Sequence, residues 1–157
     1  MKAASAKSAL KIQSVLGEDF EVLEFEESTR TAADAAAALG CEVAQIAKSM
    51  VFIAVGTGRP VLVIASGPVR VDTDKVGRLL GETIERATPA FVREHSGFAI
   101  GGVPPVGHRT KPETVIDETL LRLSELWAAG GTPNAVFRLT PGDLVALTNG
   151  QVADIAE

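Results

Sequence analysis

The chain has 157 residues, 46% of them hydrophobic and 22% charged, and a formal net charge of -5. This size and mixture predict one compact globular domain over residues 1–157 with an apolar core of small and β-branched side chains. The acidic charge counts against general polyanion binding, because Lys and Arg contacts to phosphate supply most of that affinity.

The first third of the chain predicts two helices, a strand and a helical turn. Apolar residues at helical spacing predict a helix over residues 5–16, and a strand follows over 20–25. Thr31 and Asp34 resemble a capping box at the start of an alanine-rich helix. Residues 42–46 form a further helical turn.

The middle of the chain predicts a hairpin followed by alternating helix and strand. Two β-prone runs, residues 50–55 and 61–65, flank a turn that contains Gly, Thr, Arg and Pro. Such a turn is typical of the connection between two antiparallel strands, so a hairpin is predicted. A capped helix over 72–80, a short strand over 83–86 and a helix over 88–94 with proline in its first turn come next.

The last third predicts mostly strands. A short strand over 98–100 leads into a loop rich in glycine and proline at 101–107. A Gly-Gly turn at 130–131 and a final helix over 140–147 are also predicted. Three further strands are expected over residues 114–117, 123–128 and 135–139. The elements together predict an α/β (α+β) fold in which one mixed sheet or barrel is flanked by helices.

The cysteine and histidine pattern argues against disulfides and metal sites. Cys41 is the single cysteine, and neither His95 nor His108 lies at zinc-ligand spacing from it. No apolar run has the length of a signal peptide or a membrane span. We therefore expect a cytoplasmic protein without a metal, a cofactor or membrane contact. A small basic patch remains available in the middle of the sequence, from Arg70, Lys75, Arg78, Arg86, Arg93, Arg109 and Lys111.

The segment from Gly101 to His108 is the most informative part of the sequence, because it holds three glycines and two prolines in eight residues. Such a loop can present consecutive backbone N–H groups to an anion or a carbonyl, as an oxyanion hole does. A tight turn between two strands is the ordinary alternative.

Three side chains are further candidates for chemistry. Lys48 precedes a strand, where a solvated strand end is the ordinary interpretation. Cys41 has no histidine near it in sequence, which favours packing over nucleophilic catalysis. His108 is a candidate general base, although Arg109 and Lys111 would lower its basicity if they are close in space. The residues alone therefore indicate a soluble α/β domain with one unusual loop.

Six segments carry a family resemblance: Thr31–Ala36, Gln45–Ser49, Gly101–His108, Val115–Asp117, Gly130–Gly131 and Leu139–Leu144. In this order, over nearly the whole chain, they resemble the YbaK/ProX family of prolyl-tRNA editing proteins. The resemblance implies a mixed, largely antiparallel barrel-like sheet with helices around it, in the freestanding, trans-acting form. It also implies a cofactor-independent hydrolase for tRNA(Pro) mischarged with Ala, Ser, Cys or 2-aminobutyrate, with mischarged tRNA and prolyl-tRNA synthetase as partners.

The resemblance also implies site residues. Lys48 would contact the aminoacyl-adenosine end of the tRNA, and backbone amides of Gly101 and Gly102 would hold the ester. Water and a ribose hydroxyl of the substrate would replace a side-chain nucleophile. The other implied substrate-binding residues are Thr31, Val103, Pro104, Pro105, Gly107, His108, Asp117 and Asn134. Asn134 stands where some branches of the family have a histidine.

Two alternatives stay open at this level. One is a module of the same fold that binds aminoacyl-tRNA or a synthetase without hydrolysis. The other is an unrelated hydrolase or small-molecule binder that uses the Gly/Pro loop as an anion site, which the acidic net charge supports.

Overall fold

The computed structural model describes the whole chain except Ser28 and Arg30. The helices in this part are α1 (Lys7–Leu16), α2 (Ala32–Leu39), α3 (Thr73–Leu80), α4 (Pro89–Ser96) and α5 (Pro141–Thr148), with 3-10 turns η1 (Val43–Gln45) and η2 (Glu118–Arg122). The strands are β1 (Lys2–Ala3), β2 (Val22–Glu24), β3 (Ile46–Ala54), β4 (Pro60–Ser66), β5 (Ile84–Arg86), β6 (Glu113–Asp117), β7 (Leu126–Ala129), β8 (Ala135–Leu139) and β9 (Gln151–Ala153).

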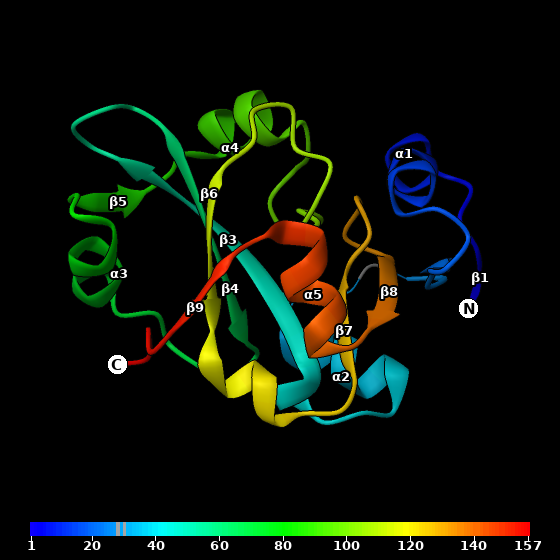
Figure 1. Ribbon diagram of the computed structural model, residues 1–157. Helices are drawn as coiled ribbons and strands as arrows, with labels where there is room; N and C mark the ends of the chain where they lie inside the picture. Colours follow the sequence, from blue (N-terminus) through cyan, green and yellow to red (C-terminus); the bar gives the residue numbers. More distant parts are fainter. Residues whose placement is uncertain (28, 30) are drawn as a thin grey trace.

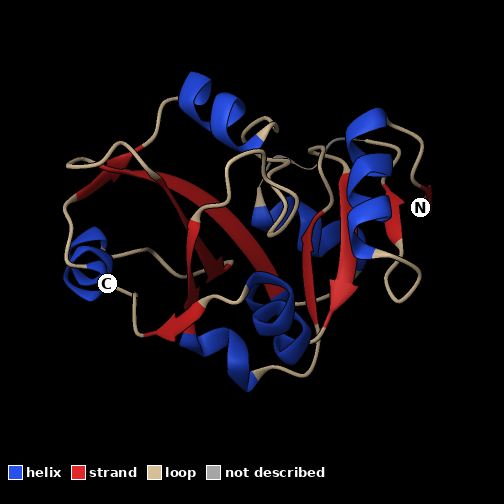
Figure 2. Cartoon of the chain, turned by 45° about the horizontal axis from the view of Figure 1, so that its top comes forward, coloured by secondary structure: helices blue, strands red, loops and turns tan. Residues whose placement is uncertain are grey.

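The nine strands of the described residues form one mixed sheet, in the order β1-β2-β8-β7-β3-β4-β6-β9, with β5 paired to β3. Five of the strand pairs are antiparallel and three are parallel. Helices lie on both sides of the curved sheet (Figures 1 and 2). The predicted α/β fold with a mixed, largely antiparallel sheet is confirmed.

Strand β4 lies at the centre of the fold because both of its faces are covered. Alternate side chains of a strand point to opposite faces. Val61, Val63 and Ala65 therefore pack with Val76 of α3 in one core cluster. Leu62 and Ile64 point the other way, into the larger cluster that also contains residues of α1, α4 and α5. This double burial accounts for the continuous apolar run in the sequence.

Three predicted strands differ from the structure. The strand predicted over 98–100 is wrong, because these residues form a turn after α4 in which the Gly102 N–H donates to the Ala99 carbonyl. The strand predicted over 123–128 begins only at Leu126, after η2. Strand β3 begins four residues earlier than predicted, so Lys48 lies inside a strand and not before it.

One edge of β3 is only partly paired. Strand β4 pairs with β3 over residues 47–53, whereas on the other edge β7 pairs at 46–47 and β5 at 52–54. Residues 48–51 therefore have no strand beside them on that edge, among the residues that the structure describes. We call this four-residue stretch the open edge of β3.

The direction of the hydrogen bonds along β3 shows which peptide groups face the open edge. The Ala54 N–H donates across the hairpin to the Arg59 carbonyl, and the Val55 N–H donates the other way, to Thr83. Because these directions alternate along a strand, Ser49 and Val51 direct their N–H and C=O groups into the gap between β7 and β5. The Ser49 peptide group bonds to no described residue there, whereas the pairing of Phe52 with Arg86 places the Val51 carbonyl at the end of β5.

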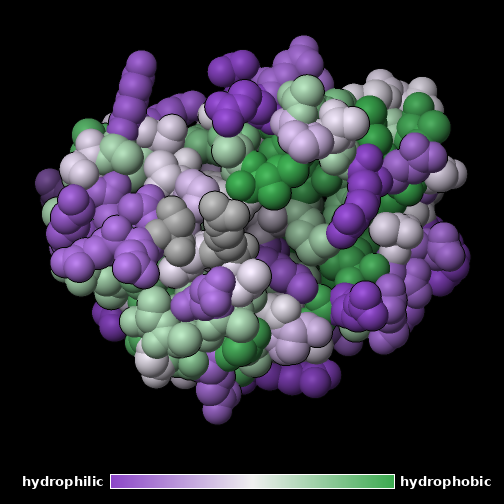
Figure 3. Space-filling view, turned by 180° about the vertical axis from the view of Figure 1, so that it is seen from behind, coloured by the Kyte–Doolittle hydropathy of each residue, from purple (hydrophilic) through white to green (hydrophobic). Residues whose placement is uncertain are grey.

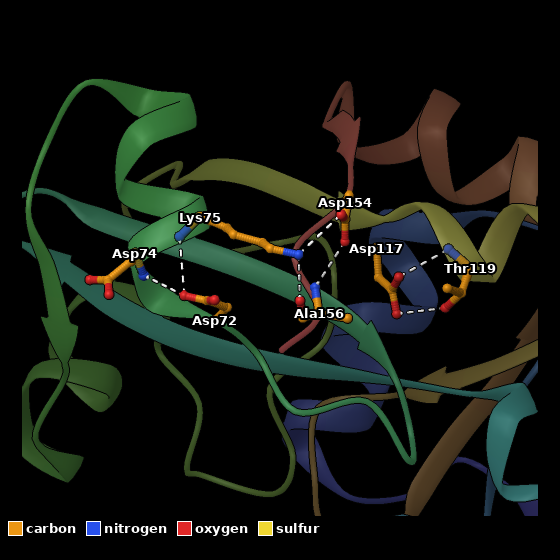
Figure 4. Close-up of polar contacts among 7 residues, drawn as sticks. All are labelled: Asp72, Asp74, Lys75, Asp117, Thr119, Asp154 and Ala156. Carbon is orange, nitrogen blue, oxygen red and sulfur yellow. Dashed lines mark hydrogen bonds and ion pairs between the residues drawn. The ribbon is translucent and has the colours of Figure 1, made fainter.

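Two polar contacts hold the outer elements in place. Lys75 of α3 donates to the Asp154 carboxylate at 3.0 Å and to the Ala156 carbonyl at 2.8 Å, which joins α3 to the C-terminal segment (Figure 4). At the other end of the sheet, the buried carboxylate of Glu24 accepts from the Ser5 N–H and hydroxyl and from the Ala6 N–H, at 2.7–3.1 Å. Glu24 thus replaces the missing side-chain cap of α1.

Glu24 makes the stability of the fold depend on pH. The Ser5 hydroxyl and then the Ala6 N–H lower the pKa of Glu24 below its ordinary value of 4.5. A carboxyl with a lowered folded pKa stabilises the fold fully above its unfolded pKa, and that contribution is lost as pH falls through the folded pKa. We expect Glu24→Gln to lower the Tm at pH 7 by about 2–6 °C, because a neutral amide accepts weaker hydrogen bonds.

Thermal unfolding of both proteins between pH 7 and pH 3 checks this expectation. The difference in Tm should begin to shrink below about pH 4.5, where the unfolded carboxyl takes up a proton, and should shrink further as pH falls through the lower pKa of the folded carboxyl. A difference that stays constant down to pH 3 would contradict the charged role of Glu24.

Candidate functional site

A cavity of about 200 Å³ opens at the open edge of β3. We call it the alanine cavity, because small side chains from α2, β3, β7 and β8 make up much of its wall. Its described lining residues are Thr29, Thr31, Ala32, Ala35, Ile46, Ala47, Lys48, Ser49, Gly101, Val103, Trp127, Ala128, Ala129, Pro133, Ala135 and Val136. Apolar surface gathers around a recess on the face seen from behind (Figure 3).

Lys48 is the charged group among the described residues that line the alanine cavity. Its Nζ donates to the carbonyls of Gly67 and Val69, at 3.0 and 2.6 Å. Burial is the main cause that lowers the pKa of Lys48, and the charge of Arg70 lowers it further, while Asp117 acts in the opposite direction. An ammonium group has three donors, so one N–H of Lys48 is left for a ligand.

Gly67 has to be a glycine for this arrangement. A Cβ at this position would lie 2.3 Å from the carbonyl oxygen of Val43, which no side chain can tolerate. The close approach of the two backbone segments brings the turn after β4 against η1 and places its carbonyls over Lys48. The lysine is therefore held by two main-chain carbonyls of a turn that is packed closely against η1, and its ammonium position is well defined.

Asp117 lies behind Lys48 and outside the lining of the alanine cavity. Its carboxylate is 1% exposed and accepts from the Ser66 N–H at 3.0 Å. It also accepts from the N–H and the hydroxyl of Thr119, at 2.9 and 2.8 Å (Figure 4). Asp117 thus joins the ends of β4 and β6, and its charge favours the protonated form of Lys48.

The Gly/Pro loop brings two backbone amides to the cavity. Gly101 and Val103 line it, and their N–H groups donate to no described residue. Gly102 differs, because its N–H donates to the Ala99 carbonyl at 3.0 Å. A Cβ on Gly102 would lie 2.7 Å from the backbone of Thr132, so this glycine permits close packing of the loop on the turn before β8. Gly101 and Val103 are therefore the loop residues of the lining whose N–H groups have no described partner.

Ser49 is a site residue that the sequence analysis did not single out. Its hydroxyl is buried and has no hydrogen-bond partner among the described residues, although the residue lines the alanine cavity. Buried hydroxyls in native structures almost always have a partner. Ser49 directly follows Lys48, but only the open edge of β3 distinguishes it from an ordinary strand serine.

Several of the residues predicted for the site do not line the alanine cavity. Pro105, Gly107 and His108 line a separate cavity of about 240 Å³ between the loop and α5. The His108 Nε2 lies 2.6 Å from the Pro104 carbonyl, and burial, followed by the charge of Lys11, lowers the pKa of His108. Arg109 and Lys111, which the sequence suggested as possible causes of a lowered pKa, are not among the causes for His108.

Asn134 also lies outside the lining of the alanine cavity. Its side chain accepts from the Thr132 hydroxyl at 2.8 Å and donates to the Phe25 carbonyl at 3.1 Å, so it braces the turn before β8. Thr31 lines the cavity and also caps α2, since its hydroxyl accepts from the Asp34 N–H.

Cys41 packs beside α2 and does not line the cavity. Burial raises the pKa of its thiol, which disfavours the thiolate that nucleophilic attack requires. Within the described residues, no group of His, Cys, Asp and Glu could hold a metal ion. In the same part of the chain, none of the helices combines the length and apolar character of a membrane span.

Comparison with known proteins gives consistent matches. The family description "Aminoacyl-tRNA editing domain" matches residues 26–147. The uncharacterized protein YwhH of Bacillus subtilis is 35% identical over 124 residues, which cover 79% of this chain and 78% of YwhH. The "Putative Cys-tRNA(Pro)/Cys-tRNA(Cys) deacylase EbsC" of Enterococcus faecalis is 27% identical over 132 residues, which cover 83% of this chain and 80% of EbsC.

A solved structure described as "a putative trans-editing enzyme for prolyl tRNA synthetase" is also similar. It superposes with a TM-score of 0.93 at 50% identity, and the match covers 98% of this chain and 99% of the other.

Ser49 and Ser66 allow a matched test of what the Ser49 hydroxyl does. Ser66 is buried and its hydroxyl donates to the Ala44 carbonyl, so Ser66→Ala should lower the free energy of unfolding by about 1–3 kcal/mol. Ser49→Ala removes no hydrogen bond of the described protein and should leave stability unchanged or raise it. Chemical denaturation of the two variants checks this pair of outcomes. An equal loss in both would mean that the Ser49 hydroxyl has a structural partner.

Proposed function

The chain belongs to the aminoacyl-tRNA editing domain family, and on this basis we propose that it is a trans-acting deacylase for mischarged tRNA. The family match covers most of the chain, residues 26–147, and includes every described residue that lines the alanine cavity. The observation that carries the proposal is the cavity itself. It combines a fixed cation, free backbone donors and small apolar walls.

The proposed reaction is hydrolysis of the ester that joins an amino acid to the ribose of the terminal nucleotide. Water adds to the ester carbonyl, and the bond between that carbon and the ribose oxygen breaks. The ribose oxygen takes up a proton, so that a free amino acid and a free tRNA end result. Negative charge develops on the carbonyl oxygen before the bond breaks, and fixed donors stabilise it. The Gly101 N–H and the third N–H of Lys48 are suited to that role.

A side-chain nucleophile is not required by this proposal. Cys41 and both histidines lie outside the described lining of the cavity. Lys48 and Ser49 are consecutive on a strand, so their side chains point to opposite faces, and the Lys48 ammonium is already bonded to two carbonyls. A ribose hydroxyl of the substrate would then orient the attacking water, as the family resemblance implies.

The amino acid is proposed to be small. The alanines of α2, β3, β7 and β8 leave a cavity of about 200 Å³, which suits Ala, Ser, Cys or 2-aminobutyrate. The names of EbsC and of the similar solved structure support tRNA(Pro) as the carrier and prolyl-tRNA synthetase as a partner. Packing differences of one methylene are worth only about 1–3 kcal/mol, so graded rates across these amino acids are expected.

A binding module of the same fold is the second candidate. The two hydrogen bonds from Lys48 to carbonyls support this candidate, because they leave a single N–H of the ammonium to act on a ligand. Incubation of the purified protein with mischarged tRNA(Pro) separates the two, because the enzyme releases free amino acid with multiple turnovers, and the module binds without release.

Lys48→Ala should reduce the deacylation rate by about tenfold or more, since a charge-assisted contact is worth on the order of 1.5–3 kcal/mol. Lys7→Ala is the matched control, because Lys7 is exposed on α1 and its loss changes the net charge equally. Single-turnover rates on mischarged tRNA(Pro) check both variants. Wild-type activity in a folded Lys48→Ala protein would remove Lys48 from the site.

Cys41→Ser should leave the deacylation rate within about twofold of wild type, because a surface or packing substitution away from the site changes little. The thiol has a raised pKa and lies outside the cavity lining. The rate is measured on the same mischarged tRNA, with circular dichroism as the check of folding. Loss of all activity with the fold intact would establish a thiolate mechanism and contradict attack by water.

A further inference from the structure

A second cavity lies on the other side of the Gly/Pro loop from the alanine cavity. It has a volume of about 210 Å³ and lies between β3, β5, α4 and the loop. Its described lining residues are Ser49, Met50, Val51, Phe52, Arg86, Ala87, Val92, Ile100, Gly101 and Val103. We call it the Arg86 cavity.

The two cavities share a wall. Ser49, Gly101 and Val103 line both of them. The shared residues are those with unused polar groups: the Ser49 hydroxyl, the Ser49 peptide group and the N–H groups of the two loop residues. A ligand that spans both cavities would place its middle portion against these groups. The open edge of β3 thus borders both cavities.

The chemistry of the Arg86 cavity differs from that of its neighbour. Its walls are mostly apolar, Arg86 is the charged residue among the described lining, and that lining contains no carboxylate. None of the ion pairs among the described residues involves Arg86. Ile100, on the rim, is 58% exposed, although it is a large apolar residue. An apolar slot with one free guanidinium suits a flat ring that carries a phosphate.

We infer that the Arg86 cavity binds the terminal nucleotide of the acylated RNA, with its base against the apolar wall and its 5′ phosphate on Arg86. The inference rests on the proposed deacylase function and adds to it the division of the substrate between two cavities. The amino acid occupies the alanine cavity, and the ester lies at the shared wall between the two. There the free N–H of Gly101 is close to the ester carbonyl, and the Ser49 hydroxyl faces the ribose.

Charge supports this orientation of the substrate. The protein has a net charge of -5, yet each cavity contributes a cation and no carboxylate among its described lining residues. A phosphate entering the alanine cavity would meet an ammonium already bonded to two carbonyls. Arg86 is exposed and takes part in none of the ion pairs among the described residues, and guanidinium is the group that binds phosphate with two parallel hydrogen bonds.

Two small substrates test the role of Arg86 directly. These are the aminoacyl esters of adenosine and of adenosine 5′-monophosphate, both carrying the amino acid that the wild type removes fastest from tRNA(Pro). We expect the wild type to prefer the phosphorylated ester by about tenfold or more in kcat/KM, mainly through KM, as a charge-assisted contact to phosphate predicts. Arg86→Gln should abolish this preference and leave the adenosine ester unaffected.

Arg78→Gln is the matched control, because Arg78 is exposed on α3, outside the lining of both cavities, and the charge change is the same. It should keep the wild-type preference. A preference that survives in Arg86→Gln, or that is lost equally in Arg78→Gln, overturns the inference. The inference is also overturned if the wild type cleaves acylated tRNA but shows no preference between the two small esters, or cleaves neither of them. In these cases the deacylase function stands. A wild type that cleaves no ester at all refutes the deacylase function, and the inference with it.

The apolar wall has its own pair of variants. Ile100→Ser should raise KM for both small esters, because it removes apolar surface that faces the base. Val55→Ser is its control, since Val55 is 50% exposed and lines neither cavity. An unchanged KM in Ile100→Ser would place the base outside the Arg86 cavity and overturn this part of the inference.

Discussion

The incomplete pairing of β3 is the constraint on which the site depends. The strand has nine residues, and β4 accompanies it for almost its whole length, but β7 and β5 reach only its two ends on the opposite edge. Unpaired backbone groups inside a protein are costly, and an open edge is normally covered or paired. Here the Gly/Pro loop covers the edge without bonding to it. The polar groups of Ser49 are thereby sheltered and remain available.

Two glycines hold the covering segments at the right distance. Gly67 lets the turn after β4 approach Val43, so that its carbonyls reach the ammonium of Lys48. Gly102 lets the Gly/Pro loop approach the backbone of Thr132, and its N–H is used to fix the loop to Ala99. Both close approaches use space that a side chain would fill. Gly102 therefore supports the site by packing, and the neighbouring amides stay free.

Local patterns allowed much of the fold to be predicted from the sequence. The hairpin of β3 and β4 and the helix starts at Thr31, Thr88 and Thr140 depend on short-range signals, namely β-prone runs around a turn and capping side chains. The strand expected over 98–100 failed because its apolar residues serve two tertiary roles. Phe98 fills the core, while Ile100 stands at the rim of a cavity. Alternation within three residues cannot distinguish these cases.

The site could be predicted only in part, for a similar reason. Lys48, Thr31, Gly101 and Val103 meet at one cavity, and they belong to segments that carry the family resemblance. Ser49 and Arg86 have no local signal for a site. Ser49 becomes distinctive because β7 stops pairing with β3 at Ala47, two residues before it. Arg86 becomes distinctive because β5 ends there, beside a cavity that α4 also lines. Both facts are consequences of long-range strand pairing.

The distribution of charge explains how an acidic protein can present a site for RNA. Carboxylates gather at a separate cavity of about 670 Å³, which is lined by Glu18, Asp19, Glu21, Glu125 and Asp143 among others. Arg138, the basic residue in that lining, forms an ion pair with Glu125 at 3.6 Å. Phosphates are repelled from such a surface and attracted to a cation without a partner. Under the proposed function, an RNA end is therefore attracted to Lys48 and Arg86 at the open edge of β3. With few cations in total, the protein gains little non-specific affinity for RNA, and so its selectivity must come from the two cavities.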